Sequence, residues 1–117
     1  MQYAFAGSDV RLRGLQTQHI AALRSLTGTL VGTWDCEIDT CDEGIHCAYL
    51  VARDWADGNA AAFVVSWKEG QFILADRRQT SDFGNTGAAA APIRYYWNTI
   101  TDVVGHIADT IGVRAPR

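Results

Sequence analysis

The amino-acid sequence predicts an α+β fold of two layers, in which an antiparallel meander of four or five strands carries two helices on one face. Apolar and polar residues alternate over residues 29–39, and further apolar runs follow as far as residue 76, separated by short turns; this pattern is typical of an antiparallel sheet. Apolar residues recur at helical spacing on either side of this region, over about 17–27 and 92–111. Because strands and helices are segregated along the chain, a parallel α/β sheet is not expected.

The whole chain, residues 1–117, is expected to form a single domain. Its length is within the usual range for one domain, and a chain of this size can bury its own hydrophobic core. Hydrophobic residues make up 48% of the sequence and charged residues 20%, and this composition excludes an intrinsically disordered chain.

The first helix is expected to begin at Thr17, whose hydroxyl can accept a hydrogen bond from the first helical turn. Ile20, Leu23 and Leu26 then recur on one face of the helix. Gly28 follows the last of them and is a suitable residue to end the helix.

Four strands are expected after this helix. The turns between them are short and rich in Gly, Asp and Asn, so consecutive strands should pair antiparallel. The first strand carries Asp35, Glu37 and Asp39 on one face. A straight strand spreads its carboxylates apart, so we expect a solvated acidic surface there rather than a calcium site. The four strands are expected at residues 29–39, 47–53, 61–67 and 72–75.

The second helix is expected to begin near Pro92, which suits the first helical position, and to end at Gly112. The apolar residues of this segment share one helical face: Ile93, Tyr96, Trp97, Ile100, Val103, Val104, Ile107 and Ile111. We expect Trp34, Trp97 and Ile100 to be buried, because each lies on the apolar face of its own element.

The third strand is apolar on both faces, with Phe63, Val65 and Trp67 on one and Ala62 and Val64 on the other. Two helices on one side of a sheet leave such a second face uncovered. Large exposed apolar patches mark interfaces, so a homodimer through this face is expected, although the sequence does not determine which face it is. The expected interface residues are Tyr49, Phe63, Val65 and Trp67.

The formal net charge of −3 argues against nucleic-acid and anionic-membrane partners. No apolar run approaches the roughly 18 residues of a transmembrane helix, and the first residues lack the pattern of a signal peptide. We therefore expect a cytoplasmic protein with no nucleic-acid or membrane partner. Nine of the ten basic residues are arginine, which, with the richness in alanine, is typical of GC-rich bacterial genomes.

Three cysteines lie close together in the sequence: Cys36, Cys41 and Cys47, with His46 beside the third. In a reducing compartment we expect free thiols and no intramolecular disulfide. Adjacent residues of a strand point to opposite faces, so His46 and Cys47 are not expected to share an ion. The sequence therefore predicts neither a metal site nor a cofactor.

Asp102 lies four positions before His106 in the second helix, so the carboxylate can accept a hydrogen bond from the imidazole. Such a pair is the base and its orienting group in a catalytic triad. It is also an ordinary feature of a polar helix face, and no nucleophile can be identified from the sequence.

The long connection over residues 77–91 is the candidate site for an anion, because it combines positive charge, hydroxyl groups and glycines. The candidate ligand-binding residues in it are Arg77, Arg78, Thr80, Ser81 and Asn85.

Three functions remain open on the sequence alone. The first choice is a small interaction protein that self-associates through an apolar sheet face and that meets a further protein partner. The alternative is a protein that binds a small molecule or anion between the sheet and residues 77–91. The third is a small enzyme that uses Asp102 and His106.

Overall fold

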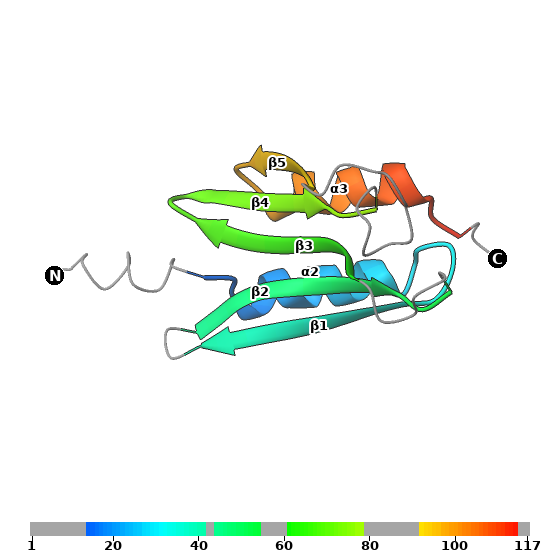
Figure 1. The fold of residues 1–117 in the computed structure, drawn as a ribbon, viewed down its shortest axis with the longest axis horizontal. Coiled ribbons are helices and arrows are strands. Elements are labelled where there is room, and N and C mark those ends of the chain that lie inside the picture. The colour runs from blue at the N-terminus through cyan, green and yellow to red at the C-terminus, as the bar shows by residue number, and fades with distance from the viewer. Residues whose placement is uncertain (1–13, 42–43, 55–60, 79–91, 115–117) are drawn as a thin grey trace, which may run out of the picture.

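The computed structural model describes residues 14–41, 44–54, 61–78 and 92–114. These residues form an α+β fold with an antiparallel meander, as the sequence predicts, and the sheet has five strands in the order β1-β2-β3-β4-β5 (Figure 1). The elements are α2 (Thr17–Thr27), β1 (Trp34–Cys41), β2 (Gly44–Ala52), β3 (Ala61–Lys68), β4 (Gln71–Asp76), β5 (Ile93–Trp97) and α3 (Ile100–Ile111).

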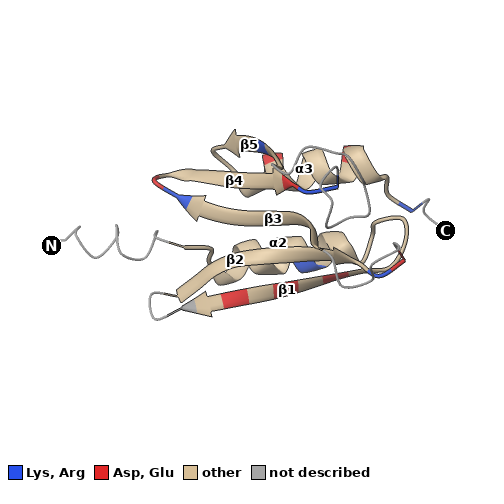
Figure 2. Cartoon of the chain, viewed as in Figure 1, with Lys and Arg blue, Asp and Glu red and all other residues tan. Residues whose placement is uncertain are grey.

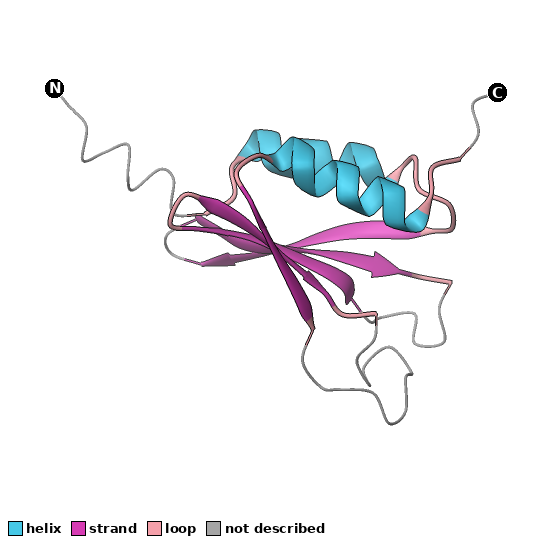
Figure 3. Ribbon diagram, turned by 90° about the horizontal axis from the view of Figure 1, so that it is seen from above, coloured by secondary structure: helices cyan, strands magenta, loops and turns pink. Residues whose placement is uncertain are grey.

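The two helices lie side by side on one face of a twisted sheet, so the fold has two layers (Figure 3). Helix α2 contacts β1, and α3 contacts β4 and β5. The core between the layers contains fully buried side chains from both helices and from the central strands, among them Leu23, Leu50, Phe63, Leu74 and Ile107. Neither described helix is long and apolar enough to cross a membrane.

Helix α2 covers the predicted range, but Gln16 rather than Thr17 occupies the N-cap position. The backbone N–H of Gln16 donates to Nδ1 of His19 at 3.0 Å. The His19 ring also packs edge-on against Phe72, with ring centroids 4.8 Å apart. Partial burial lowers the pKa of His19, which favours the neutral imidazole that this hydrogen bond requires.

Strand β1 begins at Trp34 and not at residue 29, because Gly32 adopts a φ of 98° that interrupts the extended chain. The segment before it is instead held by the C-terminal residues. The backbone N–H of Val31 donates to the carbonyl of Gly112 at 2.9 Å, and Arg114 Nη2 donates to the carbonyl of Gly32 at 2.8 Å. The segment expected to begin the strand is therefore a connection between α2 and β1, held by hydrogen bonds to the residues that follow α3.

The expectation of a helix from residue 92 is wrong for its first part, since Ile93–Trp97 forms β5. Leu74 pairs with Tyr95 across β4 and β5, and Phe72 pairs with Trp97. A short apolar run fits both a helical and a strand period, and pairing with the open edge of β4 decides between them. Helix α3 then begins at Ile100, after Thr99 caps it by accepting a hydrogen bond from Asp102 N–H at 3.1 Å.

This change of element also alters the burial of the residues expected in the core. Trp34 is buried, as predicted, and its indole N–H donates to the carbonyl of Val31 at 2.9 Å. Trp97 and Ile100 are half-buried and pack against the edge of the core. The expectation of full burial is wrong for these two residues because they lie at the edge strand and at the first turn of α3.

The strand register determines which sheet face the helices cover. Leu50 pairs with Phe63, and Val65 pairs with Leu74, all beneath the helices. Tyr49 pairs with Val64 on the other side. We call this other side the open face, because none of the described helices covers it; it carries Asp35, Glu37, Asp39, Cys47, Tyr49, Val64, Ser66, Ile73, Ala75, Arg94 and Tyr96.

The expected interface set is corrected by this register. Phe63 and Val65 have no exposed surface because they pack under the helices. Trp67 is half-buried against the same core. Of the four residues named as an interface, Tyr49 is the one that the strand register places on the open face.

Two neighbouring substitutions test this register. Val65→Arg should unfold the protein, because it buries an unpaired charge whose cost of several kcal/mol is comparable with the total stability of a domain. Val64→Arg should leave a folded protein, because Val64 is half-buried on the open face. Circular dichroism and urea unfolding of both variants are the measurements, and a folded Val65→Arg beside an unfolded Val64→Arg would contradict the assignment of faces.

Candidate functional site

The open face is hollowed across β2, β3, β4 and β5, and the hollow has a volume of about 610 Å³. Its apolar floor is formed by Val64, Ile73 and Ala75, which are half-buried side chains from the two central strands. The full lining is His46, Cys47, Tyr49, Val64, Ser66, Trp67, Lys68, Ile73, Ala75, Arg77, Pro92 and Arg94. The volume lies within the range of small-molecule sites, roughly 300–1,000 Å³.

Three cationic side chains border this hollow: Lys68 at the end of β3, Arg77 directly after β4, and Arg94 in β5. Figure 2 shows basic residues at the end of β3, after β4 and in β5, and acidic residues along β1. Lys68 and Arg94 are exposed and make no ion pair with the residues that the structure describes. The hollow is therefore a local cationic region on a chain of net negative charge.

The acidic side of the open face is partly neutralised. Arg53 Nε lies 2.6 Å from an Asp35 carboxylate oxygen, and its Nη2 lies 2.9 Å from a Glu37 oxygen. Asp39 is exposed and has no ion pair with the described residues. The open face thus divides into an acidic edge on β1 and a cationic region on β3, β4 and β5.

A β-bulge lies where β1 and β2 approach their connecting turn. Asp39 pairs with Cys47 and Thr40 pairs with Ile45, so His46 is an extra residue in β2. Both His46 and Cys47 therefore line the hollow, although adjacent residues of a regular strand would point to opposite faces. The expectation that these two side chains point to opposite faces is wrong for this reason.

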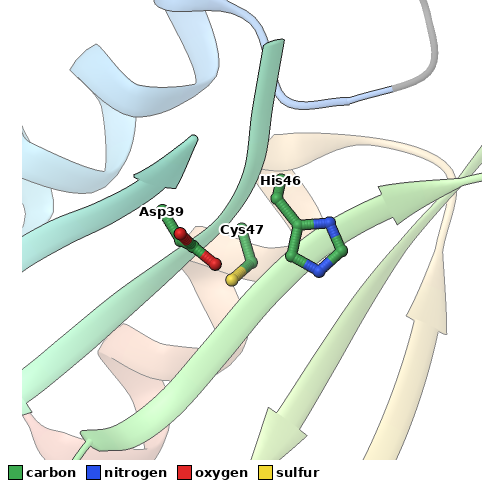
Figure 4. A group of neighbouring side chains, drawn as sticks. All are labelled: Asp39, His46 and Cys47. Atoms are coloured by element: carbon green, nitrogen blue, oxygen red, sulfur yellow. The ribbon is translucent and has the colours of Figure 1, made fainter. Parts of the chain in front are cut away.

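The bulge brings Asp39, His46 and Cys47 into one group (Figure 4). A carboxylate oxygen, an imidazole nitrogen and the thiol sulfur all lie within 4.8 Å of one another. Asp39 and His46 are exposed, whereas Cys47 is buried. These three residues can present three different ligand atoms to one ion.

The thiol of Cys47 is not activated as a nucleophile. Burial raises its pKa, and the Asp39 charge raises it further, while a hydrogen bond from Tyr49 acts in the opposite direction. That same hydrogen bond to the Cys47 sulfur raises the pKa of Tyr49 to about 12. Burial likewise raises the pKa of Cys36. Both thiols are therefore protonated near neutral pH, unlike those of cysteine-dependent enzymes.

The cysteines do not form one cluster. Cys36 is half-buried and packs against the core under the helices, whereas Cys47 lies on the open face. Both are free thiols, as expected. The side chain of Cys41 lies outside the described part of the structure.

The expected pairing of Asp102 with His106 is not present among the described hydrogen bonds. Asp102 lies in the first turn of α3, where its carboxylate accepts from the Thr99 hydroxyl at 2.9 Å. The His106 ring instead contacts the rings of Tyr95 and Trp97, with centroids 4.4 and 5.1 Å away. Its Nε2 is buried and has no hydrogen-bond partner among the described residues. The Asp102 carboxylate is therefore engaged in the helix cap and does not orient the His106 imidazole.

Two of the expected anion-binding residues, Arg77 and Arg78, lie on opposite faces of the sheet. Arg77 lines the hollow on the open face. Arg78 lies on the helix side, where its guanidinium pairs with Asp76 at 2.6 Å and stacks 5.3 Å from the centre of the Phe63 ring. Thr80, Ser81 and Asn85 lie outside the described residues.

Sequence reasoning missed Lys68, Arg94 and Asp39 as members of the site. The sequence pattern predicts a helix at Arg94, a turn at Lys68 and a solvated strand face at Asp39. Strand alternation within residues 93–97 could have placed Arg94 on the open face, but only if β5 had been recognised. No family profile, curated protein or solved structure matches this chain.

The Asp76–Arg78 pair predicts a pH dependence of stability. Burial raises the pKa of Asp76, but hydrogen bonds and charge from Arg78 outweigh it and hold the pKa below its usual value. Folding thus favours the carboxylate, and its stabilising effect is complete above about pH 4 and lost as the pH falls through the lowered folded pKa. Urea unfolding between pH 7 and pH 3 should show this loss.

The Asp76→Asn variant should be less stable at pH 7 by about 3 kcal/mol, because Arg78 loses its partner. Its stability should also vary less below pH 4 than that of the wild type. Asp109→Asn, on the exposed side of α3, serves as the matched control and should follow the wild-type profile. Parallel profiles for wild type and Asp76→Asn would contradict the role of the pair.

Proposed function

We propose that this protein binds a small organic anion with an apolar body in the hollow of the open face. The observation that carries the proposal is the combination of an apolar floor with cationic side chains at its border, Lys68 and Arg94 foremost. Small-molecule sites are mostly apolar and contain a few polar groups that orient the ligand. A carboxylate or phosphate group can meet the cations while the apolar part covers Val64, Ile73 and Ala75.

The positions of the cations support an anionic ligand over a neutral one. Arg94 and Lys68 project from β5 and from the end of β3, on two sides of the floor. An arginine side chain can bind a carboxylate or phosphate through two parallel hydrogen bonds. Because the floor excludes water from one side, the charge interaction is stronger there than between fully solvated groups.

Two hydroxyl groups in the hollow can orient the ligand. Ser66 lies on the floor of the hollow between Cys47 and Ile73 in the paired strands. Tyr49 lies on β2, and its hydroxyl is held by the hydrogen bond to Cys47. These groups favour a ligand with polar atoms in addition to its charged end.

The binding of 8-anilinonaphthalene-1-sulfonate, an aromatic anion, tests the proposal by fluorescence titration of the folded protein. Arg94→Gln and Lys68→Gln should each weaken binding about tenfold, because each removes one charged hydrogen-bond donor. Arg24→Gln, on the helix layer, is the matched loss of charge and should bind as the wild type does.

The uncharged ring compound N-phenyl-1-naphthylamine completes this test. It should bind more weakly than the sulfonate to the wild type, and its binding should not change in Arg94→Gln. Equal binding of the two compounds, or an equal loss in Arg24→Gln, would refute an anion site in the hollow. Near-ultraviolet circular dichroism confirms that each variant retains its packed core.

Self-association through the open face is a second candidate function, favoured by the separation of charge on that face. Asp35, Glu37 and Asp39 line one edge, and Arg94 lies at the other (Figure 2). A two-fold axis parallel to the strands would stack β1 of one copy on β5 of a second copy, so opposite charges would meet. Tyr96, 55% exposed on the same face, adds an aromatic contact typical of interfaces.

A charge exchange tests this arrangement by light scattering. The wild type should be dimeric at tens of micromolar, whereas Arg94→Glu and Glu37→Arg should each be monomeric because like charges would then face each other. A mixture of the two variants should form a heterodimer, since both contacts are then between opposite charges. A monomeric wild type, or a mixture that stays monomeric, would contradict self-association through this face.

A further inference from the structure

The group at the β-bulge has a chemistry that the anion site does not use. Its three side chains offer a carboxylate oxygen, an imidazole nitrogen and a thiol sulfur, all within 4.8 Å of one another. Figure 4 shows the Asp39 carboxylate and the Cys47 sulfur next to each other, with the His46 ring beside them. We infer that Asp39, His46 and Cys47 bind a Zn²⁺ ion and leave its fourth coordination position open toward the hollow.

The spacing is suitable for tetrahedral zinc after small side-chain rotations. Bonds of about 2.0–2.3 Å place the ligand atoms of a tetrahedral ion roughly 3.3–3.8 Å apart, somewhat closer than the 4.8 Å limit observed here. Asp39 and His46 are exposed, so their side chains can rotate by this amount. Cys47 is 4% exposed and is the fixed member of the group.

The mixture of donors selects the class of metal. Calcium and magnesium are bound by oxygen atoms and do not take thiolate ligands. Sulfur, nitrogen and oxygen together suit Zn²⁺, which accepts cysteine, histidine and carboxylate ligands in one site. A thiolate and a carboxylate also balance the charge of the ion, and the proton of the Cys47 thiol passes to solvent when the metal binds.

The surrounding residues support the ligand set. Tyr49 lies two residues after Cys47 and lines the hollow with it, and residues beside a metal ligand can hold its orientation. The bulge itself fixes His46 beside Cys47 on one side of the sheet. His46 and Cys47 both line the hollow, so an ion between them borders it, and water or an anionic group can occupy the fourth position.

The proposed ligands of this site do not include Lys68 or Arg94, the cations on which the proposed anion function rests. A loss of metal binding and a loss of anion binding can therefore be told apart with separate variants. The three proposed zinc ligands are not the three neighbouring cysteines of the sequence. Asp39 is one of the ligands, and Cys36 lies on the opposite face of the sheet.

The experiment uses the full chain without an affinity tag and Co²⁺ as the spectroscopic substitute for Zn²⁺. One equivalent of Co²⁺ should produce the visible bands of tetrahedral cobalt and a near-ultraviolet thiolate-to-cobalt band, and Zn²⁺ should displace it. Cys47→Ser should lose the thiolate band and bind Zn²⁺ at least about 100-fold more weakly. His46→Ala and Asp39→Asn should weaken binding at least about tenfold.

Cys36→Ser and Cys41→Ser are the matched controls, and both should retain the wild-type spectrum. Should Cys47→Ser fail to fold, the exposed His46→Ala variant still decides the outcome, and circular dichroism verifies the fold of each protein. No thiolate band in the wild type, an unchanged spectrum in His46→Ala, or loss of the band in either control would overturn the assignment.

Discussion

The pairing of β2 with β3 beneath the helices determines which side chains of the central strands lie on each face of the sheet. Leu50 and Phe63 face each other in this register and are fully buried. Because side chains alternate along a strand, their burial places Tyr49 and Val64 on the opposite surface. A shift by one residue would place Val65 outside and Val64 under the helices, and would remove the floor of the hollow. The packing of the hydrophobic core thus determines which side chains lie on the open face, although that face is on the other side of the sheet.

The bulge at His46 in β2 interrupts this alternation beside the hollow. The inserted residue, His46, lies next to Cys47 on the same side and opposite Asp39. Bulges redirect a side chain without changing the rest of a sheet, and here the change adds nitrogen and sulfur donors beside an acidic strand. The β1 edge carries negative charge, the opposite edge carries Arg94, and the bulge lies on the acidic side. One surface therefore contains two regions of different chemistry.

The sequence predicts the layers of this fold well, because helix and strand periods differ and the turns are marked. The range of α2 and the meander follow from these patterns. The sequence does not predict β5, since Tyr95 and Trp97 fit a helix stripe as well as a strand and only pairing with β4 selects the strand. It also does not predict the bulge, which has no characteristic residue in this chain. Asp102 and His106 have the spacing of a pair, but Thr99 binds the carboxylate first.

The two proposed sites on the open face would influence each other through charge. Without metal, Asp39 is a negative charge beside the hollow and the Cys47 thiol is neutral, because its pKa is raised by burial. A bound Zn²⁺ ion compensates both the carboxylate and the thiolate that forms, so the negative field at this end of the hollow disappears. An anion then meets less repulsion, and an anion that fills the open coordination position gains a direct bond. Because coupling between two binding sites is reciprocal, a bound anion would strengthen metal binding by the same factor. Both proposed sites border one hollow, because His46 and Cys47 line it together with Lys68 and Arg94.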